Sequence, residues 1–171
     1  MHLTAILPIL ALAVTALSAP LETRHRGPEE YYSLGCPTNT TRPYASQHEQ
    51  TEVLNTFANE VFVQQQVALG YDTYAAVSFI NHAPEVSGSG IAIVVPFQTA
   101  ELKGGSVDLQ RVFVGTNLTG TSFGTIHFRG NSVAFGEGDI AGIWRMIGTC
   151  LVEYWDVASG VEASENPIAY F

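Results

Sequence analysis

The chain has 171 residues, the length of one domain, and can bury a substantial hydrophobic core. Seven Lys and Arg residues against 16 Asp and Glu residues give a net charge of −9, and Lys103 is the only lysine. A phosphate backbone is bound by clustered basic side chains, so this composition argues against nucleic-acid binding.

The N-terminus, residues 1–18, is an apolar run that ends in small residues. It is shorter than the ~20 residues of a stable membrane span, and its small-residue end is typical of a secretory signal peptide. The alternative, a buried N-terminal helix, conflicts with Pro8. We therefore expect cleavage after Ser18 and a protein that is secreted or enters the lumen of the secretory pathway.

Residues 19–45 are rich in proline, charge and polar groups and show no periodicity, which predicts an irregular N-terminal extension. Sequons at Asn39 and Asn117 predict glycosylation on exposed loops of a secreted protein. In an oxidising compartment Cys36 and Cys150 are expected to form a disulfide bond, with two unpaired thiols as the alternative.

The main domain, residues 46–171, opens with a helix. Ser46 and Glu49 form a capping box, in which each side chain satisfies a free backbone N–H at the helix start. Apolar residues, Phe57 and Val61 among them, then recur at helical spacing up to Gly70, a plausible C-terminal stop. This stripe is core or the lid of a ligand pocket.

Shorter elements follow in the middle of the chain. Asp72 can cap a helix that runs to residue 77, and an extended piece then leads to Pro84. Residues 91–100 could form either a strand or a helix. Their β-branched run favours a strand, whereas a family that the chain resembles has a helix near this position. Pro96 argues against a long helix there.

The second half of the chain is strand-like. The expected strands are 107–114, 122–129 and 132–135, followed by a hairpin over 141–157, and glycine clusters separate them. Helices first and an antiparallel sheet afterwards is α+β order. A long helix wrapped by a strongly curved sheet makes a cone with an open mouth.

The hairpin carries the main functional signal. On its second strand Tyr154 and Asp156 share one face, and Glu153 and Trp155 share the other. A two-residue loop would place Trp144 opposite Glu153, whereas a three-residue loop would place it opposite Tyr154. The residues alone leave both registers open.

The hairpin sequence G-I-W-R-M-I-G-T-C-L-V-E-Y-W-D-V resembles the D-I-F-R-x-x-D-G-K-I-V-E-H-W-D-V signature of SnoaL-like proteins, relatives of polyketide cyclases and ketosteroid isomerases. Residues 62–84 and 165–171 resemble two further stretches of that family. The resemblance implies a cystatin-like cone, with a long N-terminal helix and short helices wrapped by a strongly curved antiparallel sheet. It also implies the three-residue loop, with Trp144, Tyr154 and Asp156 on the concave face, and a homodimer through the outer face of the sheet.

Four residues are candidates for chemistry. Asp156 on an apolar wall would have a raised pKa, as a general acid or base near neutral pH requires, or it is a structural carboxylate bonded to the backbone or an arginine. Tyr154 could donate a hydrogen bond to an oxyanion or form pocket wall. By the resemblance, His82 matches a turn histidine and His127 a strand histidine; both could instead be structural. Trp144, His127, Phe57 and Val61 are the expected ligand contacts.

The sequence also departs from the family at two positions. Gly142 stands where the family has an acid ahead of I-F-R, and Ala83 stands at the Asn or Asp before the turn proline. We therefore expect either a cofactor-independent cyclase or isomerase acting on a small, hydrophobic, polyketide-derived metabolite, or a secreted binding protein without catalysis. The scattered histidines argue against a metal site, and we expect no cofactor.

Overall fold

The computed structural model describes residues 28–118, 120–133 and 136–160. The predicted signal peptide and the family-like segment 165–171 lie outside these residues. The elements in chain order are α1 (Pro28–Ser33), α2 (Gln47–Ala58), the π-helical turn η1 (Asn59–Val63), α3 (Val67–Tyr74), β1 (Ala75–Asn81), α4 (Ile91–Leu102), β2 (Ser106–Thr116), β3 (Ser122–Ser132), β4 (Gly136–Ile147) and β5 (Cys150–Gly160).

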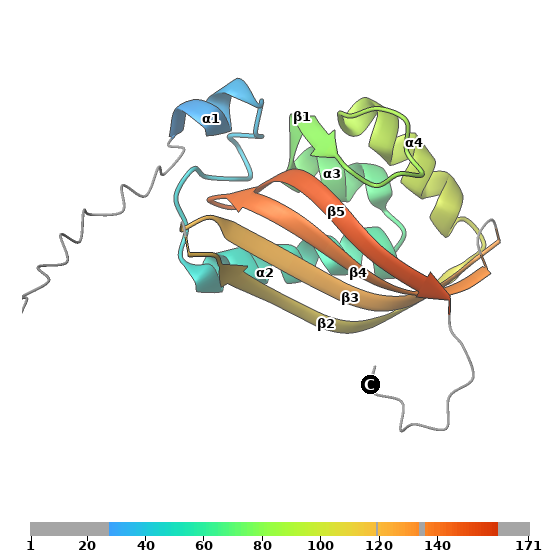
Figure 1. Ribbon diagram of the computed structural model, residues 1–171. Helices are drawn as coiled ribbons and strands as arrows, with labels where there is room; N and C mark the ends of the chain where they lie inside the picture. Colours follow the sequence, from blue (N-terminus) through green and yellow to red (C-terminus); the bar gives the residue numbers. More distant parts are fainter. Residues whose placement is uncertain (1–27, 119, 134–135, 161–171) are drawn as a thin grey trace, which may run out of the picture.

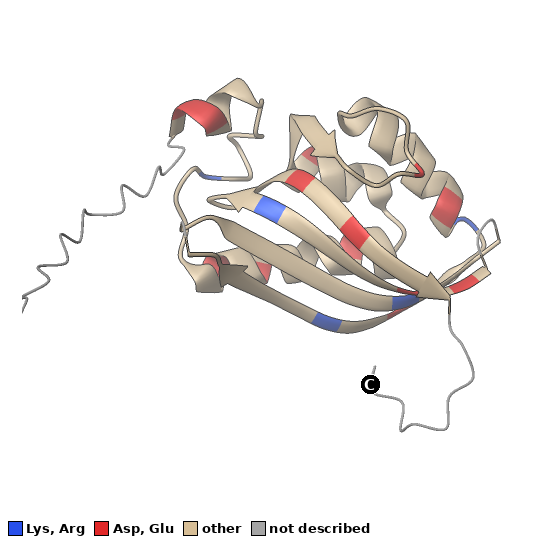
Figure 2. Ribbon diagram, in the orientation of Figure 1, with Lys and Arg blue, Asp and Glu red and all other residues tan. Residues whose placement is uncertain are grey.

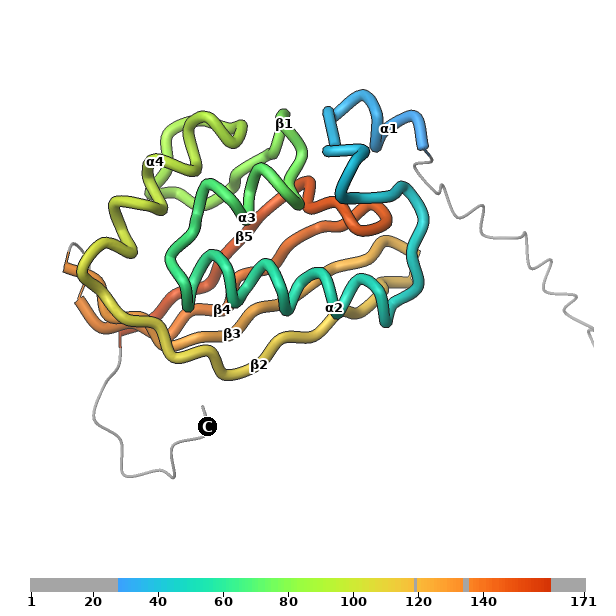
Figure 3. Tube along the Cα trace, turned by 180° about the vertical axis from the view of Figure 1, so that it is seen from behind, coloured from blue at the N-terminus to red at the C-terminus, as the bar shows by residue number. Residues whose placement is uncertain are grey.

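The five strands form one curved sheet in the order β1-β5-β4-β3-β2 (Figure 1). β1 runs parallel to β5, and all other pairs are antiparallel. Seen from behind, α2 and α3 lie across the sheet, while α1 and α4 lie at opposite ends of it (Figure 3). The predicted α+β fold with a curled antiparallel sheet is confirmed. Among the described residues, no helix is long and apolar enough to cross a membrane.

The first long helix begins as predicted and ends earlier. Ser46 and Glu49 make the capping box of α2. The helix stops after η1 because Gln65 adopts a positive φ of 56°, which a regular helix excludes. Gly70, predicted as the stop, lies inside α3, where a Cβ would collide with Val61. Its absent side chain lets α3 pack closely against η1.

Two predictions are wrong, one about the helix before β1 and one about the N-terminal extension. The expected helix 72–77 ends at Tyr74, because Ala75 already begins β1 and pairs with β5. The expected strand 132–135 lies partly outside the described residues, and within them β3 extends to Ser132 and β4 begins at Gly136. The extension 19–45 is not wholly irregular, because it contains α1.

The ambiguous segment 91–100 is helical and belongs to α4, despite Pro96 within it. Pro96 lies on the exposed side of this helix. Among the β-branched residues of α4, Val94 is only 4% exposed and Ile91 and Val95 pack partly buried against the core, whereas Ile93 is exposed. Packing against the rest of the fold has overridden local β-propensity here.

The β4–β5 hairpin combines features of both expected registers. Its turn has two residues, since Ile147 pairs with Cys150, and Gly148 has the positive φ of 55° that a type II′ turn needs at its first position. A β-bulge follows, because Met146 pairs with Leu151 and Arg145 already with Glu153. The extra residue restores the pairs that a three-residue loop would give, so Trp144 faces Tyr154 and Gly142 faces Asp156.

The N-terminal extension is attached to the tip of this hairpin. Cys36 and Cys150 form the predicted disulfide bond, with an S–S distance of 2.02 Å. The backbone N–H groups of Arg42 and Thr149 also donate hydrogen bonds across the same junction. On the outer face of the sheet, Arg145 forms ion pairs with Glu153 and with Glu30 of α1. The extension is therefore an ordered part of the domain from residue 28 onward.

The main core lies between the helices and the concave face of the sheet. Phe57 and Phe62 pack edge-on against Trp144, which is fully buried. Phe62 also packs against Phe128 of β3, with ring centroids 4.7 Å apart. This aromatic cluster fills one end of the cone and leaves the other end, beneath α4, unfilled.

Candidate functional site

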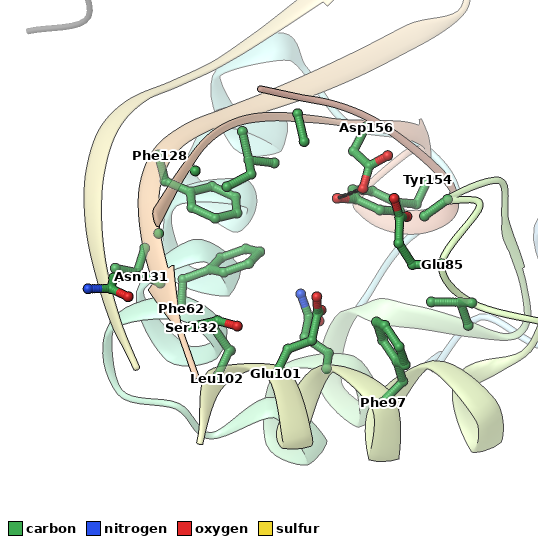
Figure 4. A pocket seen from close by; sticks show the side chains of 18 of the residues that line it. Phe62, Glu85, Phe97, Glu101, Leu102, Phe128, Asn131, Ser132, Tyr154 and Asp156 are labelled. Atoms are coloured by element: carbon green, nitrogen blue, oxygen red, sulfur yellow. Dashed lines mark hydrogen bonds between the residues drawn. The ribbon is translucent and has the colours of Figure 1, made fainter. Parts of the chain in front are cut away.

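A cavity of about 320 Å³ occupies the end of the cone between α4 and the concave face of the sheet. Figure 4 shows Tyr154, Asp156 and Glu85 on one wall and Phe62 and Phe128 on the opposite wall. Phe97 and Glu101 rise from α4 and close a third side (Figure 4). The volume is at the small end of the range of about 300–1,000 Å³ found for small-molecule sites.

β5 supplies an acid and a phenol to this cavity. Tyr154 and Asp156 are two residues apart on a strand, so both side chains point to the concave face. The Tyr154 hydroxyl donates a hydrogen bond to Asp156 Oδ2 at 3.2 Å. Burial and then the charge of Glu85 raise the pKa of Asp156, although the hydrogen bond from Tyr154 opposes the shift.

α4 supplies a second carboxyl group that the sequence reasoning missed. Val94, Phe97, Gln98 and Glu101 follow at helical spacing and all line the cavity. Burial, then the charges of Glu85 and Asp156, raise the pKa of Glu101 to about 7. One signal could have identified it, since Glu101 is the only charged residue in a predominantly apolar helix.

The phenol groups have strongly perturbed acidities. Burial and then the charge of Asp156 raise the pKa of Tyr154 well above its ordinary value of 10. Tyr71 of α3 also lines the cavity, and its pKa is raised by burial and by Glu101. Both phenols therefore stay protonated at physiological pH, and the hydroxyl of Tyr154 donates its hydrogen bond to Asp156.

Three expected ligand contacts, on α2, η1 and β4, do not line the cavity. Trp144, Phe57 and Val61 are fully buried in the core beside it. Trp144 contacts a residue of the site, Tyr154, whose ring centroid lies 4.7 Å from that of the indole. These residues support the wall that carries the acid and the phenol.

The two candidate histidines lie away from the cavity. His82 is exposed and stacks on Trp155, with ring centroids 4.6 Å apart, on the face opposite Tyr154 and Asp156. The ring of His127 lies between Arg111, at 2.9 Å, and Asp139, at 3.0 Å. The structure therefore brings Tyr154 and Asp156 together with Glu101, and brings neither histidine to them.

Gly142, at the position of the family's acid, lies directly beneath aromatic rings. A Cβ at this position would lie 2.5 Å from Cη2 of Trp144 and 2.9 Å from Cε2 of Tyr154. Any larger side chain would displace both rings. Within the described residues, no group of three or more His, Cys, Asp or Glu side chains is arranged to hold a metal ion.

Solved structures of the same fold include an NTF2-like protein of unknown function from Cytophaga hutchinsonii, at 7% identity and a TM-score of 0.52 over 64% of this chain and 89% of that one. A candidate ketosteroid isomerase from Kribbella flavida matches at 13% identity and a TM-score of 0.49, over 69% and 84% of the two chains. A candidate polyketide cyclase from Acidithiobacillus ferrooxidans matches at 17% identity and a TM-score of 0.47, over 64% and 87%. No protein-family model and no curated protein matches the sequence. The likeness to these structures shows that the chain has an NTF2-like fold. Its activity depends on the chemistry of the cavity.

Proposed function

We propose that the protein is a cofactor-independent isomerase or cyclase that moves protons on a small, mainly apolar carbonyl compound. One observation carries this proposal: two carboxyl groups with raised pKa values, Asp156 and Glu101, share one largely apolar cavity with the phenol of Tyr154. Carboxyl groups tuned toward neutral pH suit proton transfer to and from carbon next to a carbonyl.

In the proposed reaction Asp156 is the general base. It removes a proton from the carbon beside the carbonyl, and the C–H electrons form a carbon–carbon double bond while the carbonyl oxygen becomes an enolate. The Tyr154 phenol donates a hydrogen bond to that oxygen once Asp156, its partner in the resting site, has taken up the proton. In an isomerisation, Asp156 returns the proton to a different carbon. In a cyclisation, the enolate carbon bonds to the carbon of a second carbonyl, the π electrons of that carbonyl move to its oxygen, and Asp156 returns the proton to this new alkoxide.

The test is exchange of carbon-bound hydrogen for deuterium. Small cyclic ketones such as 1-indanone and 2-tetralone, incubated with the protein in D₂O, should exchange the protons beside the carbonyl faster than in buffer, as followed by NMR. Asp156→Asn keeps the shape of the side chain and should slow this exchange by about 10²-fold or more. Asp72→Asn, an exposed substitution on α3, is the matched control and should have no effect.

A second candidate is a binding protein of the same fold without catalysis. It is favoured by Gly142, because the rings of Trp144 and Tyr154 leave no room for the acid that the resembling family has there. Wild-type protein that binds the ketones but exchanges no hydrogen, or Asp156→Asn protein that exchanges at the wild-type rate, would favour this alternative over the enzyme.

Assembly as a homodimer through the outer face of the sheet is a further part of the proposal. Two apolar side chains of that face are well exposed, Phe113 at 53% and Val157 at 68%. Contact with a second copy would remove them from water. Light scattering on the purified protein should give twice the mass of one chain, and a monomer mass would contradict the dimer.

A further inference from the structure

Three of the four acidic side chains that line the cavity have no cationic partner among the described residues. Four carboxylates and no Lys, Arg or His occur among the described residues that line it. Glu137 is paired with Arg129 at 2.6 Å, but Glu85, Glu101 and Asp156 form no ion pair with any described residue. Figure 2 shows acidic positions on both α4 and β5, the two elements that enclose the cavity. Like charges held together in a partly dry cavity favour the uptake of a positive charge.

Unsatisfied polar atoms in the same cavity give a second, independent indication of a ligand. Tyr71 lines the cavity and is only 1% exposed, and its hydroxyl makes no hydrogen bond to any described residue. Oε1 of Gln98 is buried and also lacks a partner. Leaving a buried polar group unpaired costs about 1–3 kcal/mol, so a ligand that donates hydrogen bonds here removes a penalty of the empty site.

We propose that the natural ligand of this cavity carries a protonated amine on a flat, apolar body, an inference that rests on the proposed function for its site. An ammonium group offers only donors, which match the oxygens of Glu101, Glu85 and Gln98. The rings of Phe62, Phe97 and Phe128 provide the apolar walls, and aromatic faces also attract a cation. A carboxylate or phosphate ligand would meet like charges and no basic side chain.

Binding of such a ligand has a proton signature. Burial, and then the charges of Glu85 and Asp156, raise the pKa of Glu101 to about 7, and Glu101 also faces the neutral phenols of Tyr71 and Tyr154. An ammonium group beside Glu101 lowers that pKa again, because it stabilises the ionised carboxylate. Amine binding near pH 7 is therefore coupled to release of a proton, whereas binding of a neutral analogue is not.

The experiment compares amines with alcohols and carboxylates of the same shape. Tryptamine, tryptophol and indole-3-propionate form one set, and phenethylamine, 2-phenylethanol and 3-phenylpropionate form a second. Calorimetric titration at about pH 8 should show the amine binding about tenfold or more tightly than its alcohol, since hydrogen bonds to charged groups exceed neutral ones. Repeating it near pH 7 in buffers of different ionisation enthalpy should reveal proton release for the amine alone.

Two variants test whether Glu101 causes the preference for amines and the proton release. Glu101→Gln should reduce the preference for amine over alcohol to within about threefold and remove the proton release, while Glu52→Gln, exposed on α2, should leave both unchanged. Equal affinity within both sets, including no binding of any compound, overturns the amine assignment, as does a preference that survives in Glu101→Gln. Because binding is measured without turnover, amine preference without deuterium exchange overturns only the proposed enzyme. Exchange without amine preference overturns only this inference.

Discussion

The carboxyl group of Glu101 should destabilise the folded protein above neutral pH. Its pKa is raised from an ordinary 4.5 to about 7, first by burial and then by Glu85 and Asp156. The folded chain thus holds this proton more tightly than the unfolded chain, so stability falls as the pH rises from about 4.5 to about 7. Glu101→Gln, a neutral side chain of the same shape, should therefore stabilise the protein at about pH 8 and change little near pH 4.

The size of the effect follows from the two pKa values. A tenfold difference in proton affinity corresponds to about 1.36 kcal/mol, so the pKa of about 7 against 4.5 sets an upper limit of about 3.4 kcal/mol. Glu101 is only partly buried, and solvent screening reduces this limit. We expect Glu101→Gln to add roughly 1–2 kcal/mol to the free energy of unfolding at about pH 8.

Urea denaturation of both proteins at about pH 4, 6 and 8 measures this difference directly. The gain from Glu101→Gln should grow with pH and level off above about pH 7. Glu52→Gln, with an exposed carboxylate, should show no such growth. If Glu101→Gln raises the free energy of unfolding equally at all three pH values, or lowers it at about pH 8, the carboxylate of Glu101 is not destabilised by burial and by repulsion from its neighbours.

Three further predictions concern the rest of the chain. Replacing Cys36 and Cys150 by Ala should lower the free energy of unfolding by about 4–5 kcal/mol for a closed loop of 114 residues, and a loss below about 1 kcal/mol in urea titrations would contradict this. Expression in a eukaryotic host should yield a glycosylated protein without residues 1–18, and mass spectrometry that finds the intact N-terminus would contradict secretion. Gly142→Ala should destabilise by about 1–3 kcal/mol by pushing on Trp144, so an unchanged melting temperature would show that the rings can move freely.

The features that the sequence predicted correctly depend on near neighbours in the chain or on chemistry with few alternatives. The capping box of α2 needs only Ser46 and Glu49, three residues apart. The β4–β5 hairpin follows from two β-rich runs around Gly148. The disulfide was predicted because the sequence has two cysteines, Cys36 and Cys150, and because we expect the protein to enter an oxidising compartment.

The features that were missed depend on contacts far apart in the chain. The bulge after Leu151 shifts the pairing of the two hairpin strands by one residue, and no local residue pattern predicts this bulge. α4 is helical although its β-branched residues favour a strand, because Val94 is buried against the rest of the fold. Glu101 is placed in the cavity by that helix, so leaving the structure of this segment open concealed the second carboxyl group as well.

Gly142 and Glu101 together suggest how the site differs from the family that the hairpin resembles. In this chain the position of the family's acid on β4 is covered by the rings of Trp144 and Tyr154, and it can hold no side chain. A second carboxyl group still reaches the cavity, but it comes from α4, on the side that faces Asp156. Comparison of β4 alone therefore indicates a lost acid, whereas the cavity as a whole retains two carboxyl groups with raised pKa values. Because acid–base chemistry depends on which groups face the ligand and not on which element carries them, the absence of an acid at Gly142 is weak evidence against catalysis.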